Sequence, residues 1–151
     1  MLPAIHLGRL KPSLPILTTE KSSSYAQLLK DCVKNRSLLN GKLIHAQIIV
    51  TPGFESLSTY TQNNLLTMYV KCKSVADARR VFEQMDNRDV VTWTAIIGAY
   101  AREGNAKEAL KLFTLMRVKS LIKPSHFTFA SVLPAVTSLG AIEEGKRIHE
   151  E

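Results

Sequence analysis

The amino-acid sequence predicts an all-α fold, a right-handed α-solenoid of stacked helix-turn-helix repeats. The first observation is internal similarity: a shift of 31 residues aligns 78–85 with 109–116, and a shift of 104 residues aligns 41–45 with 145–149. The second is that apolar residues recur at the i, i+3, i+4, i+7 spacing of amphipathic helices, whereas the period-two alternation of strands is nowhere sustained. Since one helix pair cannot bury both of its apolar faces, identical pairs must stack into an array.

Residues 1–21 precede the repeats and are interpreted as a leader. They carry three basic side chains, Arg9, Lys11 and Lys21, against the single acid Glu20, and three serines follow. This composition is typical of an organelle transit peptide. A leader without a targeting function explains the same composition, so both interpretations stay open.

Four units follow the leader, and each is predicted to hold two amphipathic helices. The units span 22–58, 59–89, 90–125 and 126–151, and the last stops inside its second helix. The first helices have their apolar stripes at Tyr25, Leu28, Leu29 and Cys32; at Gln62, Leu65, Leu66 and Tyr69; at Trp93, Ile96, Ile97 and Tyr100; and at Phe129, Val132, Leu133 and Val136. The second helices have theirs at Gly41, Ile44, His45 and Ile48; at Ala78, Val81, Phe82 and Met85; at Ala109, Leu112, Phe113 and Met116; and at Gly145, Ile148 and His149.

The turn between the two helices of the third unit has a recognisable sequence. Gly104 can take a positive φ, and Asn105 is predicted to be a helix N-cap with Glu108 completing a capping box. Each second helix also has one small residue that would allow close helix packing, namely Gly41, Ala78, Ala109 and Gly145.

Composition excludes several classes of protein. The longest apolar run falls short of the roughly 18 residues that a membrane-spanning helix needs. The two cysteines cannot form a disulfide framework, and the CxxC, HExxH and P-loop motifs are absent from the sequence, so we expect no metal and no cofactor. The net charge of +7 suits a polyanion such as nucleic acid, although solubility alone also explains it.

The histidines and aromatic residues are interpreted as packing residues. His45 and His149 occupy the position that Phe82 and Phe113 hold in neighbouring units, so packing is favoured over a catalytic or metal-binding role. Trp93 and the other aromatic residues of the stripes are expected in the core rather than as stacking platforms for bases.

Several motifs resemble the pentatricopeptide repeat family of land plants, in the class that alternates P, L and S repeat types. They are Leu66-Thr-Met-Tyr-Val-Lys-Cys72, Ala78-Arg-Arg-Val-Phe82 and Asp89-Val-Val-Thr-Trp93. By this resemblance 22–58 is an L-type repeat, 59–89 an S-type repeat, 90–125 a P-type repeat and 126–151 an incomplete L-type repeat. The resemblance implies a solenoid like that of tetratricopeptide repeats, and single-stranded RNA as the ligand, with one base per repeat.

In this family the fifth residue of the first helix and the last residue of the repeat select the base. Carried over, the resemblance implies that Asn63 and Asp89 form a uracil-preferring pair, since an amide both donates and accepts hydrogen bonds. Thr94 with Ser125 departs from the usual Asp or Asn ending, so a purine preference there is not assigned.

The two L-type repeats are not expected to specify a base, because Ala26 (paired with Ser58) and Ala130 lack hydrogen-bonding side chains. The second residue of each repeat usually packs against the bases in this family. Here those residues are Tyr60, Val91 and Phe127, while Ser23 is poorly suited.

The predicted function is sequence-selective binding of single-stranded organelle RNA in a mitochondrion or chloroplast, as a recognition factor for C-to-U editing. The combined HxE and CxxC signature of zinc deaminases is missing, since the sequence contains no CxxC, so no enzymatic activity is expected, and other editing or processing proteins would supply the chemistry. No membrane and no small-molecule substrate are expected as partners. A protein-interaction scaffold and a non-functional truncated fragment are the alternatives.

Overall fold

The computed structural model describes residues 21–50, 53–140 and 147–149. Over these residues the chain is helical and contains no strand. The elements are α1 (Lys21–Asn35), α2 (Leu38–Val50), the short 3₁₀ helix η1 (Phe54–Ser56), α3 (Thr59–Lys71), α4 (Val75–Gln84), α5 (Val90–Arg102), α6 (Ala106–Lys119) and α7 (His126–Ser138). The leader, apart from Lys21, and Gly145 lie outside the described residues.

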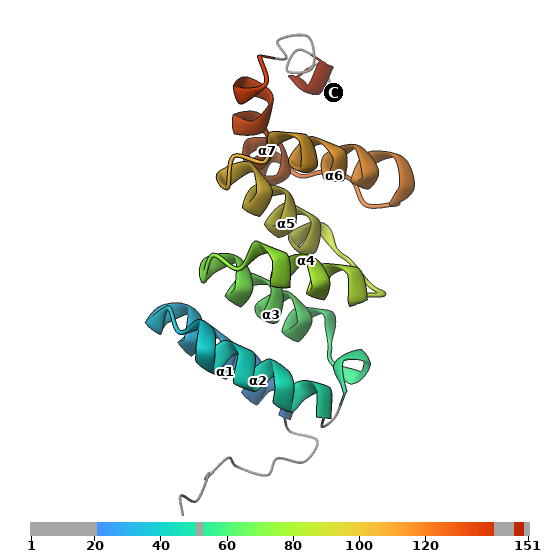
Figure 1. Ribbon diagram of the computed structural model, residues 1–151. Helices are drawn as coiled ribbons and strands as arrows, with labels where there is room; N and C mark the ends of the chain where they lie inside the picture. The colour runs from blue at the N-terminus through green and yellow to red at the C-terminus, as the bar shows by residue number, and fades with distance from the viewer. Residues whose placement is uncertain (1–20, 51–52, 141–146, 150–151) are drawn as a thin grey trace, which may run out of the picture.

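The helices stack as successive pairs along one axis (Figure 1). The first helices α1, α3, α5 and α7 each pack on the next in that order, and the second helices α2, α4 and α6 each pack on the first helix that follows them. The prediction of an all-α solenoid is therefore confirmed. As a result, the first helices lie beside one another, and residues at equivalent positions on them form rows.

One apolar core runs through the stack rather than through separate units. Leu29, Leu65, Ile96 and Val132, one from each first helix, are fully buried in it. Phe82 of α4 meets Trp93 of α5 edge to face, with ring centroids 4.9 Å apart. The other stripe aromatics Tyr69 and Phe113 are also buried, and Tyr100 is partly exposed, so the prediction that these residues pack in the core holds.

The stripe prediction is wrong at the two ends of the described stack. Leu28 on α1 is 37% exposed and Leu133 on α7 is 39% exposed, although both were expected in the core. The equivalent residues of the middle helices, such as Leu65 and Ile97, are fully buried. Helices α3 and α5 have a described first helix on both sides, whereas α1 and α7 have one on a single side only.

The helix-pair turns match the sequence in part. Gly104 has a φ of 79°, as predicted, and the Asn105 side chain accepts a hydrogen bond from the Glu108 backbone N–H. The predicted capping box is wrong in its second half, because the Glu108 carboxylate instead accepts from Arg79 at 2.8 Å. Gly41 is required for close packing, since a Cβ there would fall on the thioether of the buried Met68.

The described residues contain neither a membrane-spanning helix nor a group of metal-ligating side chains. None of the helices placed by the structure is long and apolar enough to cross a membrane. Within the same residues, no three His, Cys, Asp or Glu side chains are grouped as metal ligands.

Candidate nucleic-acid interface

The first helices α3, α5 and α7 all begin with the same local structure. The last residue of the preceding unit is the N-cap, and its side chain accepts a hydrogen bond from the backbone N–H of the third helical residue. That third residue is a buried threonine in every case. The three N-cap and threonine pairs are Ser58 with Thr61, Asp89 with Thr92, and Ser125 with Thr128.

At the middle junction, the side chains of Asn63 and Asp89, which the family resemblance named as a base-selecting pair, are in contact. The Asn63 Nδ2 donates to Asp89 Oδ1 at 3.0 Å and lies 3.1 Å from Oδ2. Asn63 is only 7% exposed, although the sequence placed it one position away from the apolar stripe. The sequence-based reasoning missed a third member: Thr92 Oγ1 donates to Asn63 Oδ1 at 2.6 Å.

The Asp89 carboxylate is held in its ionised form. Desolvation raises the pKa of Asp89, but hydrogen bonds, chiefly from the Thr92 backbone N–H, the Asn63 amide and the Val91 backbone N–H, hold the pKa below its ordinary value. An ionised carboxylate only accepts hydrogen bonds. It therefore fixes Nδ2, rather than Oδ1, as the part of the Asn63 amide that faces it.

The other two junctions have the same arrangement of N-cap and threonine but different residues at the fifth and last positions of the unit. Thr94 does not bond Ser125 directly; its Oγ1 lies 2.8 Å from Thr128 Oγ1, which is in turn 3.2 Å from Ser125 Oγ. At the first junction the Ala26 side chain offers no polar atom, and the hydroxyl oxygens of Ser58 and Thr61 lie 3.1 Å apart. A polar connection between the fifth and last residues of a repeat thus exists at two of the three junctions.

Exposed apolar side chains follow the same three helices at their second residue. Tyr60, Val91 and Phe127 are 59%, 54% and 66% exposed, although residues of these types are usually buried. The Lys30 ammonium of α1 donates to the Tyr60 hydroxyl at 2.6 Å and lies over its ring, and this hydrogen bond is the largest cause that lowers the pKa of Tyr60. The three exposed side chains thus form a row along the side of the stack where the first helices lie.

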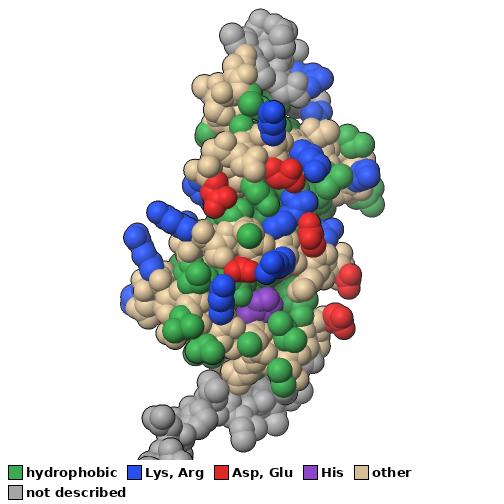
Figure 2. Space-filling view, in the orientation of Figure 1, with side chains coloured by type: hydrophobic (Ala, Val, Ile, Leu, Met, Phe, Trp, Pro, Cys, Tyr) green, Lys and Arg blue, Asp and Glu red, His purple; other side chains and the backbone are tan. Residues whose placement is uncertain are grey.

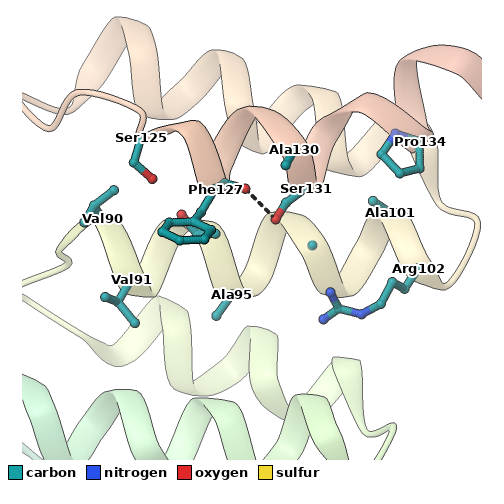
Figure 3. Close-up of a pocket in the computed structure, with 12 residues that line it drawn as sticks. Val90, Val91, Ala95, Ala101, Arg102, Ser125, Phe127, Ala130, Ser131 and Pro134 are labelled. Carbon is teal, nitrogen blue, oxygen red and sulfur yellow. Dashed lines mark hydrogen bonds between the residues drawn. The ribbon is translucent and has the colours of Figure 1, made fainter.

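An open groove of about 600 Å³ lies between α5 and α7, and its lining is largely apolar. Val91 and Phe127 lie at one end of it, and Pro134 and Arg102 lie toward the other (Figure 3). Thr94, Ser125 and Ala130 also line it. The residues that the sequence assigned separately to base selection and base packing in the third and fourth units therefore share one groove.

Many of the basic side chains are not available to such a groove. Figure 2 shows Lys and Arg interspersed with Asp and Glu along the stack. Arg79 pairs with Glu83 and Glu108, at 2.7 and 2.8 Å, and Arg80 pairs with Asp77 at 3.2 Å. Arg79 and Arg80 thus neutralise carboxylates of the second helices.

His45 has the packing role that the sequence favoured. Its Nδ1 lies 2.8 Å from the Tyr69 hydroxyl, and the two rings meet edge to face. Burial lowers the pKa of His45, and the nearby Asp77 only partly offsets it. The same interpretation is wrong for His149, whose side chain is exposed because no described helix covers it.

A repeated pattern could have revealed the missed threonines. Ser58, Asp89 and Ser125 are each followed three residues later by threonine, which is the spacing of an N-terminal capping box. The sequence therefore contains the capping role of Thr92. Its second role, as a donor to Asn63 of the preceding unit, depends on how α3 and α5 pack.

Family models match two adjoining parts of the chain. A model described as the PPR repeat family matches residues 88–136, and a model described as PPR repeat matches residues 63–90.

The chain is similar to curated proteins of Arabidopsis thaliana. A mitochondrial pentatricopeptide repeat-containing protein is 42% identical over 122 residues, which is 81% of this chain and 16% of that protein. A chloroplastic one is 42% identical over 126 residues, or 83% of this chain and 15% of that protein. The chain thus spans less than a quarter of the length of these relatives.

A solved structure has the same fold. The crystal structure of the pentatricopeptide repeat protein PPR10 from maize superposes with a TM-score of 0.70 at 22% identity, covering 82% of this chain and 18% of that one. The helix-pair stack, the two family models and the relatives agree with one another, and the chain belongs to the pentatricopeptide repeat family.

Proposed function

We propose that the chain binds single-stranded RNA along the row of first helices, with the bases approaching the junctions between units. The observation that carries this proposal is the coincidence of three features on α3, α5 and α7. Each helix has an exposed apolar second residue, a polar N-cap that ends the preceding unit, and a buried threonine at its third residue that contacts that N-cap. Stacking surfaces beside hydrogen-bonding groups are what recognition of unstacked bases requires.

The proposed base selectivity differs between the units. The unit 59–89 would prefer uracil through Asn63 and Asp89, whose contact supports the assignment. Thr94 and Ser125 would contact a base in the groove between α5 and α7 without a defined preference. Tyr60, Val91 and Phe127 would pack against the bases.

The proposed biological setting is an organelle. Two of the relatives are named as mitochondrial and chloroplastic proteins, and this supports the same localisation for the present chain. We further propose that the bound RNA is a substrate of C-to-U editing, with the repeats of the alternating P, L and S class acting as the recognition factor. The editing chemistry would then belong to other proteins or segments, and the described repeats would not act as an enzyme.

Binding of the purified chain to short RNAs tests the proposal. Adenosine-rich oligonucleotides that carry a single U, C or G are compared by fluorescence anisotropy at several salt concentrations. RNA binding through phosphates predicts an affinity that falls as salt rises, and the U-containing oligonucleotide should bind best. An affinity for RNA that does not depend on salt, or equal affinity for all of the oligonucleotides, would contradict the proposal.

The matched variant is Asn63→Ala, with Asn64→Ala as its control. Asn64 is the neighbouring residue on the same helix, and its amide donates to the Tyr60 backbone carbonyl rather than to Asp89. Asn63→Ala should remove the preference for U while leaving salt-dependent binding in place, and Asn64→Ala should change neither. If Asn63→Ala keeps the preference, the assignment of the base-selecting pair is wrong.

A further inference from the structure

Thr92 belongs to the unit 90–125, but its side chain serves the unit before it. The side chain is fully buried, and its Oγ1 lies 2.6 Å from Asn63 Oδ1 and 3.0 Å from Asp89 Oδ1. The same oxygen accepts a hydrogen bond from the Asp89 backbone N–H at 3.1 Å. A hydroxyl has one proton to donate. The shorter contact places that proton on the line to Asn63.

The two neighbours together fix the Asn63 amide at both of its ends. Asp89 accepts from Nδ2, and Thr92 donates to Oδ1. Turning the amide over would place its oxygen against an ionised carboxylate and would break the 2.6 Å hydrogen bond from the Thr92 hydroxyl, and both changes are unfavourable. What remains for a ligand is one N–H of Nδ2 and the second lone pair of Oδ1, in a fixed order.

A fixed order of donor and acceptor matters for choosing between pyrimidines. Uracil presents an N3–H donor beside its O4 acceptor, whereas cytosine presents an N3 acceptor beside its N4–H donors. An amide that can turn over satisfies either pattern, but an amide that is held satisfies one of them. The residue that holds the oxygen end therefore contributes to the discrimination between the two bases.

We propose that Thr92 is a positioning residue for base selection by the preceding unit, acting through Asn63; this inference rests on the proposed RNA-binding function. The base preference of the unit 59–89 is then set by three side chains, one of which lies in the unit 90–125. Thr92 itself does not touch the base.

The other junctions supply a matched control. Thr61 is also buried, and its backbone N–H likewise donates to its N-cap, Ser58, but the fifth residue of the preceding unit is Ala26, which has no amide to hold. Loss of the hydroxyl at Thr61 therefore removes its contact with Ser58 without releasing an amide. Loss of the hydroxyl at Thr92 removes the capping contact and the hold on Asn63.

The experiment compares the full chain with Thr92→Val, Thr92→Ser and Thr61→Val. The probes are two adenosine-rich oligonucleotides that differ by one U or one C, and the ratio of their affinities is measured by anisotropy below the unfolding midpoint of every variant. Thr92→Val should lower the U-to-C ratio about fivefold, the worth of one net hydrogen bond. Thr92→Ser, which keeps a hydroxyl, and Thr61→Val should retain the ratio.

The outcomes separate this inference from the proposed function. If the unaltered chain prefers U and Thr92→Val keeps the full ratio, the inference is overturned and the proposed function stands. If the unaltered chain shows no preference, both fall together.

A measurement on the unaltered chain covers the case in which Thr92→Val does not fold. The hydroxyl proton of Thr92 should exchange slowly with water and show a nuclear Overhauser effect to the Asn63 side-chain amide. A rapidly exchanging proton without that contact overturns the inference.

Discussion

Asp89→Ala tests how much the middle junction contributes to stability, because Ser58→Ala offers a matched comparison. Both residues are exposed N-caps of equivalent helices, α5 and α3. Loss of an N-cap side chain costs about 1 kcal/mol. Asp89→Ala also removes the acceptor of the buried Asn63 amide, which costs about 1 kcal/mol more, at the low end of the range because water can reach the vacated position.

The assay is thermal unfolding at pH 7, followed by circular dichroism at 222 nm. With a shift of about 3 °C per kcal/mol for a chain of this size, Ser58→Ala should lower the Tm by about 3 °C and Asp89→Ala by about 6 °C. Asp89→Asn keeps a cap oxygen and an acceptor for Asn63, and should therefore lower the Tm by less than Asp89→Ala does. A Tm for Asp89→Ala equal to or above that of Ser58→Ala would refute the reasoning, since the contact with Asn63 would then contribute nothing.

The pH dependence of the same contact has a defined sign. Because the pKa of Asp89 is lower in the folded chain than in the unfolded chain, its ionised form stabilises the fold above the ordinary carboxylate pKa of about 3.9. This contribution is lost as the pH falls through the lower, folded value. The Tm difference between the unaltered chain and Asp89→Asn should therefore stay constant from pH 8 to about pH 5 and narrow below about pH 4.

Three further outcomes are expected. His45 has a lowered pKa in the folded chain, so the unfolded chain takes up a proton first, and stability should fall as pH drops below about 6.5. His45→Phe should therefore flatten the curve of Tm against pH in that range. An unchanged slope would rule out His45 as the source of the pH dependence. Phe127→Ala should weaken RNA binding about tenfold, as measured by anisotropy, with little change in Tm, because the ring is exposed; a large drop in Tm would instead indicate a packing role. Gly104→Ala should cost about 1 kcal/mol in urea unfolding, because the residue has a positive φ, while Glu103→Ala beside it should be nearly neutral.

The fold could be predicted from the sequence because its determinants are local. The stripes repeat at helical spacing, and similar units in series can bury them in only one general way. The prediction was wrong at Leu28 and Leu133 because exposure depends on which neighbours a helix has, and a stripe does not show that.

The candidate site could be predicted only in part. The family resemblance named Asn63 and Asp89 as a pair, and the structure adds that their side chains are hydrogen-bonded to each other. The bond from Thr92 to Asn63 joins two helices of different units, so it depends on a distance between α3 and α5 that no pattern within either helix determines. The Glu108 carboxylate is a second example. It accepts a hydrogen bond from Arg79 of another unit instead of completing the predicted capping box, and the sequence of α6 alone does not indicate this.

The shared threonine has a consequence for building new binding specificities. A buried threonine equivalent to Thr92 is already present at the first junction. It is Thr61, which contacts the N-cap Ser58, and the fifth residue of the preceding unit there is Ala26. An amide introduced there by Ala26→Asn, with Ser58→Asp as its acceptor, would meet the same two neighbours as Asn63 does. The base-selecting amide could therefore be moved from one unit to another. The next helix already supplies the buried threonine, and only the carboxylate acceptor has to be introduced with the amide.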